Sequence, residues 1–120
     1  MLSVHVEKIG EMTVIECEGR IVRSEAAFKL RKAVESHADT RIVVLDLSEV
    51  TSVEGGGLGM LAFLQQWAQA RDIRLKLFDP QPSVRDRLEN ARWMREFDIA
   101  TLGEMMALLA LADSRYARAA

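Results

Sequence analysis

Hydrophobic residues near the start of the chain alternate with polar ones, at the spacing of a β-strand. Leu2, Val4 and Val6 alternate with Ser, His and Glu, which predicts a strand with one buried face. After a turn at residues 8–11, the segment 12–18 predicts a second strand. The short connection favours an antiparallel hairpin.

The pattern then changes from the spacing of a strand to that of a helix. Ala27, Leu30 and Val34 recur at helical spacing, and Ser24 is a good N-cap residue. The run 42–47 is apolar, rich in β-branched residues and without helical period, which is typical of a strand buried on both faces. A helix between two strands favours a βαβ crossover with parallel pairing.

A second helix, predicted over residues 58–70, carries two apolar stripes. The first consists of Leu58, Leu61, Leu64 and Ala68. The second, well round the helix, consists of Met60, Phe63, Trp67 and Ala70. A helix that lies on a sheet needs only one such stripe, so the second is covered either by neighbouring helices or by another molecule.

Three glycines lie between the buried strand and this helix. We expect Gly55, Gly56 and Gly57 to form a turn, because glycine permits positive φ and lets other groups approach the backbone closely. The start of the helix that follows has unpaired N–H groups and a positive dipole end.

The last third of the chain predicts one more strand and two more helices. The alternation over 73–78 predicts a strand, and Val84 and Leu88 belong to a third helix. Thr101 and Glu104 form a capping box that opens a last helix, and residues 113–120 are expected to be a frayed tail.

Composition indicates one globular domain spanning residues 1–120. The chain is 49% hydrophobic and 28% charged, with a net charge of −2, which gives no support to nucleic-acid binding. The apolar segments are short and interrupted by charge, and residues 1–10 lack a signal-peptide pattern, so we expect no membrane insertion. Cys17, the only cysteine, fits a reducing, cytoplasmic compartment and is expected in the core.

Candidate chemistry is sparse, so we expect neither an enzyme nor a cofactor. His5 and His37 lie in different elements, and no spacing typical of a metal site occurs. Asp46 and Glu54 could form a carboxylate pair, although Asp46 is more easily interpreted as a brace for the turn through backbone N–H groups.

Residues 46–61 resemble the central motif of the STAS domain, the fold of anti-sigma factor antagonists. That motif reads roughly D-L-S-x-V-x-x-I-D-S-S-G-L-G-x-L, and this chain matches it at Asp46, Leu47, Ser48, Val50, Gly57, Leu58, Gly59 and Leu61. Gly55 and Gly56 replace the two serines, and the usual phosphorylation site of the family corresponds to Gly56.

The resemblance implies a STAS-type α/β fold, with a mixed, mostly parallel sheet of four to five strands and helices mainly on one face. It implies a regulatory interaction module whose protein partner is a kinase-like anti-sigma factor. The missing serine implies no phosphorylation switch at the usual site, with Thr51 and Ser52 as displaced acceptors that we do not favour.

Two other functions stay open at this point. One is an accessory subunit that binds the ATPase subunit of a transporter, and the other is a sensor of a small ligand or anion. A homodimer is also possible. The expected partner-binding residues are Ser24, Glu54, Gly55, Gly56, Gly57, Gly59, Met60, Phe63 and Trp67.

Overall fold

The computed structural model describes residues 2–22, 25–91 and 97–119. These residues form five strands: β1 (Leu2–Ile9), β2 (Met12–Ile21), β3 (Ile42–Val53), β4 (Arg74–Phe78) and β5 (Ile99–Ala100). They also form four helices: α1 (Glu25–Glu35), α2 (Gly55–Ala70), α3 (Pro82–Asn90) and α4 (Leu102–Ala119).

The strands form one mixed sheet in the order β1-β2-β3-β4-β5. Strands β1 and β2 are the predicted antiparallel hairpin, with Leu2 opposite Gly19 and Ile9 opposite Met12. All later neighbours are parallel, which confirms the βαβ crossover predicted between β2 and β3. The predicted α/β class and the mostly parallel sheet are therefore confirmed.

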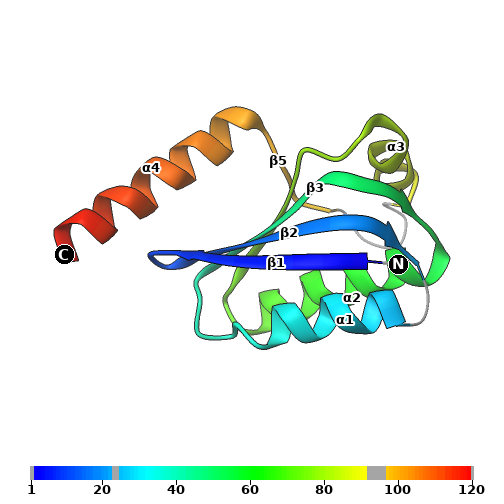
Figure 1. The fold of residues 1–120 in the computed structure, drawn as a ribbon, viewed down its shortest axis with the longest axis horizontal. Coiled ribbons are helices and arrows are strands. Elements are labelled where there is room, and N and C mark those ends of the chain that lie inside the picture. Colours follow the sequence, from blue (N-terminus) through cyan, green and yellow to red (C-terminus); the bar gives the residue numbers. More distant parts are fainter. Residues whose placement is uncertain (1, 23–24, 92–96, 120) are drawn as a thin grey trace.

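The main core lies between the sheet and helices α1 and α2, which run side by side along one face (Figure 1). The predicted stripe of α2 is buried there at Leu58, Leu61, Leu64 and Ala68. Helix α3 adds apolar residues to this core. The fourth helix packs on the opposite face, where Met105 contacts a smaller cluster built on alternate residues of β2 and β3.

Helix α4 is fastened to the sheet by its first turn. The predicted capping box is confirmed: the Thr101 N–H donates to Glu104 Oε1 at 3.2 Å, and the Glu104 N–H donates to Thr101 Oγ1 at 3.0 Å. These bonds hold the pKa of Glu104 below its usual range. The buried Lys76 ammonium of β4 also reaches Glu104 Oε2 at 3.5 Å and Asp98 Oδ2 at 3.0 Å.

Strand β3 is longer than the sequence pattern predicts. The apolar run ends at Leu47, but the strand continues to Val53. Its second half pairs with the end of β2, with Ile21 opposite Val53, and Val50 is fully buried. The register shifts between Glu16 and Arg20 of β2. Such a bulge breaks the period of two, so the alternation there was not recognisable.

Helix α2 begins one turn earlier than predicted. The glycines that we expected in a turn form its first helical turn, and Glu54 alone separates it from β3. The Glu54 N–H donates to the Ile21 carbonyl at 3.1 Å, and its carbonyl accepts the Leu58 N–H at 3.1 Å. Glycine lowers helix stability by about 1 kcal/mol per residue. Burial of Leu58 and Leu61 offsets that loss.

Helix α2 ends in a Schellman motif whose left-handed residue is not glycine. Asp72 has a φ of 60°. The Ile73 N–H donates to the Ala68 carbonyl at 2.9 Å, and the Asp72 N–H donates to the Gln69 carbonyl at 3.2 Å. Glycine is the usual residue at this position because it has no Cβ to oppose a positive φ.

We therefore expect Asp72→Gly to stabilise the fold by about 0.5–1 kcal/mol. The left-handed conformation costs a residue with a Cβ about 1–2 kcal/mol, and the greater entropy of glycine in the unfolded chain removes about 0.4–1 kcal/mol of that gain. Urea denaturation measures the change. Asp72→Ala is the control and should bring no gain. A glycine variant less stable than the parent would contradict the explanation.

Candidate functional site

The predicted site lies where β2 and β3 end and α2 begins. Strand β3 ends at Val53, and Glu54 adopts an extended conformation with no side-chain cap on the helix. The first turn holds no acidic side chain, and Glu54, Gly55 and Gly56 are exposed. The helix therefore presents its N–H groups on a surface that has almost no side chains. The exposed Glu54 carboxylate stands beside them, and it would oppose an anion bound there.

The glycines of this turn have different roles. A Cβ on Gly57 would overlap the carbonyl oxygen of Ile21, so the backbones of α2 and β2 approach too closely for any other residue. Gly57 is also buried, so we do not retain it among the expected contact residues. A Cβ on Gly55 or Gly59 would meet nothing within 4 Å. Packing thus requires glycine at position 57 but not at 55 or 59.

The hydroxyl groups close to the turn brace the strand ends. Thr51 Oγ1 donates to the Gly19 carbonyl at 3.2 Å, and Ser52 Oγ accepts from Arg20 Nε at 3.3 Å. These bonds connect β3 with β2. Both residues line a small cavity of about 250 Å³ beside α3.

The structure supports neither a carboxylate pair nor a brace for the glycine turn, because Asp46 bonds within β3 itself. Its Oδ1 accepts the Ser48 N–H at 3.0 Å, and Asp46 lies within β3, eight residues before Glu54. The thiol of Cys17 is buried nearby, as expected. Burial and, secondarily, the charge of Asp46 raise the pKa of the Cys17 thiol to about 12. Its reactive thiolate is therefore negligible at neutral pH.

The second apolar stripe of α2 is divided between core and surface. Met60 and Trp67 are partly buried against the main core, whereas Phe63 is 39% exposed. The guanidinium of Arg31 from α1 lies 4.5 Å from the Phe63 ring centroid, and that of Arg71 lies 4.5 Å from the Trp67 ring. The stripe thus forms a surface on which cations stack on aromatic rings.

Phe28 of α1 extends this surface and was not among the expected site residues. Its side chain is 64% exposed. Helices α1 and α2 both cross back between parallel strands, so they run in the same direction (Figure 1). Because Arg31 reaches Phe63, Phe28 is level with the first half of α2, one turn earlier. In the sequence, Phe28 falls outside the apolar stripe that α1 buries, and this is the signal that could have identified it as a surface aromatic residue.

Ser24, the remaining expected contact residue, lies outside the described residues. No group of three or more His, Cys, Asp or Glu side chains in the described ranges is placed to hold a metal ion. Within the same ranges, none of the helices combines the length and hydropathy needed to cross a bilayer.

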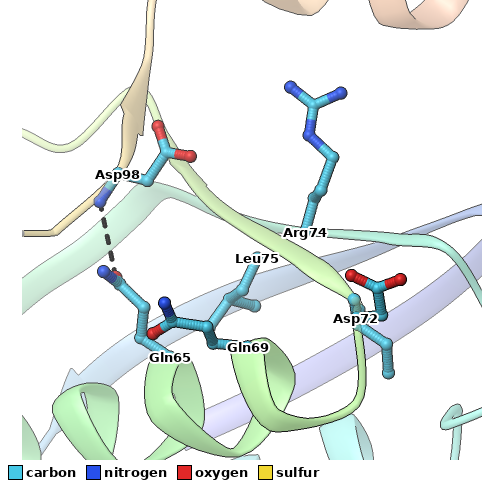
Figure 2. A pocket seen from close by; sticks show the side chains of 7 residues that line it. Gln65, Gln69, Asp72, Arg74, Leu75 and Asp98 are labelled. Atoms are coloured by element: carbon cyan, nitrogen blue, oxygen red, sulfur yellow. Dashed lines mark hydrogen bonds between the residues drawn. The ribbon is translucent and has the colours of Figure 1, made fainter.

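A cavity of about 580 Å³ lies at the other end of α2 and includes none of the expected site residues. Figure 2 shows Gln65 and Gln69 of α2 on one side of it and Asp98 on the other, with the Asp98 N–H donating to Gln65 Oε1 at 3.4 Å. The guanidinium of Arg74 extends away from the carboxylates of both Asp72 and Asp98.

Comparison with known proteins identifies one family. The sequence model of the STAS domain family matches residues 3–104, and this range includes every expected contact residue. None of the curated proteins matches the chain.

Solved structures share this fold at low sequence identity. An anti-sigma factor antagonist from Mycobacterium paratuberculosis superposes with a TM-score of 0.73 at 19% identity, over 92% of this chain and 95% of the other. The anti-sigma factor antagonist SpoIIAA in its unphosphorylated form gives 0.72 at 16% identity, over 90% and 96%. The murine Solute Carrier 26 family member A9 anion transporter gives 0.66 at 14% identity, over 88% of this chain and 18% of the transporter.

Proposed function

This chain belongs to the STAS domain family, and from that premise we propose that it is a cytoplasmic, non-enzymatic regulatory module that binds a protein partner. The proposed contact surface is the start of α2 together with the exposed side of α1 and α2. The partner class that we favour is a kinase-like anti-sigma factor, since two solved structures that superpose over nearly their whole length are anti-sigma factor antagonists.

The observation that carries this proposal is the glycine surface at the start of α2. Glycine destabilises a helix, and at Gly55 and Gly59 no neighbouring atom requires it. Glycine at these two positions is explained if the backbone of a partner protein approaches closely, because a residue without a side chain permits the closest contact. Phe63 lies one turn after Gly59 on α2, and the rings of Phe28 and Phe63 are both exposed; aromatic residues supply much of the binding energy at interfaces.

We further propose that the usual phosphorylation switch is absent. A phosphoserine would add about −1.5 to −2 charges to this surface, but Gly55 and Gly56 have no hydroxyl group to modify. The hydroxyls of Thr51 and Ser52 already take part in hydrogen bonds between strands. The protein would thus resemble a relative that is permanently unmodified.

A second candidate function follows from the same lack of a hydroxyl group. A STAS subunit that binds the ATPase of a transporter constitutively needs no switch, and Gly55 and Gly56 suit that role. Genes for a kinase-like anti-sigma factor and a phosphatase beside this one would support the first function. Genes for an ATPase and a permease would support the second.

Incubation with ATP and each kinase-like anti-sigma factor of the source organism should leave the intact mass of this protein unchanged. A Gly56→Ser variant should gain one phosphate from the partner that binds the parent protein. Mass spectrometry of the intact proteins and their peptides measures both. Stoichiometric phosphate on Thr51 or Ser52 of the parent, with loss of binding, would disprove the absence of a switch.

Replacing Phe28 or Phe63 with alanine should weaken partner binding at least about tenfold, as at other interface aromatics, with little change in stability. Trp67→Ala should also lower stability, because Trp67 packs against the core. Calorimetric titration against the purified partner measures the affinity. Leu102→Ala on α4, where the side chain is 68% exposed, is the control. Equal affinity of all four variants and the parent would exclude this surface.

A further inference from the structure

A groove with a volume of about 340 Å³ lies between α4 and the first residues of β3 and β4, on the face of the sheet opposite α1 and α2. Apolar and charged residues share its wall. The apolar residues come from β2, β3 and α4: Met12, Ile42, Leu108, Leu111 and Ala112. Leu111 is 50% exposed, so the wall keeps apolar surface that the fold does not cover.

The charged residues of the groove leave one cation without a counterion. Arg41 Nε and Glu11 Oε1 form an ion pair at 3.3 Å. The side chain of Arg74 has no hydrogen-bond or ion-pair partner among the described residues, and its guanidinium points away from Asp72, the other carboxylate at the groove (Figure 2). A guanidinium binds a carboxylate through two parallel hydrogen bonds.

We propose that this groove binds an amphipathic monoanion, such as a medium-chain carboxylate. The anionic head would bind Arg74, and the hydrocarbon chain would lie between α4 and the sheet against Ile42, Leu108 and Leu111. The volume lies within the range of small-molecule sites, and the mixed lining suits a ligand that joins a hydrocarbon chain to a charged head. The groove is distinct from the proposed partner surface, since it lies on the other face of the sheet and at the opposite end of the strands.

Such a ligand would touch both α4 and the sheet, and so it would strengthen their contact. Among the α4 side chains that the structure describes, residues 102–112, only Glu104 in the first turn forms an ion pair with the sheet, through Lys76. The groove lies about one to two turns further along the helix, at Leu108 and Leu111. Bound ligand would therefore protect the amide hydrogens of α4 from exchange with solvent.

Titration of the full chain with sodium decanoate tests the proposal. Calorimetry and the amide chemical shifts in NMR spectra monitor the titration. We expect saturable binding, shifts confined to Ile42, Arg74 and residues 108–112, and slower hydrogen exchange in α4. Arg74→Gln and Leu111→Ser should each weaken binding at least tenfold. Both positions are exposed, so both variants should fold. Arg20→Gln, a change at an exposed arginine near the opposite ends of the strands, is the matched control and should leave binding unchanged.

Two further probes separate the parts of the proposed ligand. Acetate lacks the chain and decyltrimethylammonium carries the opposite charge, so neither should bind with the affinity of decanoate. The proposal is wrong if decanoate does not bind saturably, if Arg74→Gln binds it as tightly as the control variant does, or if the cationic probe binds equally well. Each result is independent of whether a protein partner binds α2.

Discussion

Leu61→Ala should lower the free energy of unfolding by about 2–5 kcal/mol, which is the usual cost of removing a buried leucine side chain. Leu61 is fully buried in the main core, on the side of α2 that faces the sheet. The loss has two parts, the apolar surface no longer removed from water and the cavity left among rigid neighbours. Urea denaturation followed by circular dichroism measures the change.

The same substitution at Leu102 provides a matched control. That leucine is 68% exposed on α4, and surface substitutions usually change stability by less than about 0.5 kcal/mol. If Leu61→Ala lowers the free energy of unfolding no more than Leu102→Ala does, then α2 does not turn Leu61 toward the sheet as described above.

Gly57→Ala should destabilise the protein by about 1–3 kcal/mol or more, whereas the same change at Gly55 or Gly59 should stabilise it by up to about 1 kcal/mol. The opposite signs follow from the surroundings of each Cβ. At Gly57 the obstacle is the backbone carbonyl of Ile21, which is fixed by the pairing of β2 with β3 and cannot turn aside as a flexible side chain can. At the other two positions the space is open.

Thermal and urea unfolding of the three alanine variants measures these changes. If alanine at Gly55 and Gly59 stabilises the fold but weakens partner binding, the glycines are retained for contact and not for folding, a known trade-off between stability and function. Three equal stability changes would contradict the close approach of α2 and β2. Alanine variants at Gly55 and Gly59 that bind the partner normally would remove the main support for the proposed surface.

The order of the elements was predictable because their periodicities are strong. The alternation of Leu2, Val4 and Val6, the apolar run 42–47 and the stripe headed by Leu58 each fit one period over several residues. The capping box at Thr101 was predictable for another reason, since both of its hydrogen bonds are local. Features that depend on neighbouring residues in sequence can be recognised without knowing the fold.

The boundaries around the site depend on distant contacts and were not predictable. The end of β3 is determined by pairing with β2, more than 30 residues earlier in the chain. The helical state of Gly55 contradicts its own propensity. The distinction between Gly57 and Gly59 rests on the Ile21 carbonyl, and the exposure of Phe28 rests on the position of α1. None of these is visible in the local sequence.

The order of strands across the sheet has a consequence for how the chain folds. Each strand lies beside the strand that precedes it in sequence, so no strand has to be inserted between two others. The hairpin of β1 and β2 closes across a turn of two residues, and each later strand adds to the exposed edge of the sheet already formed. The two-residue hairpin turn has a low entropic cost and can form first, whereas each parallel pairing must close a longer crossover that contains a helix. During synthesis on the ribosome, β1, β2 and β3 can pair before β4 has left the exit tunnel.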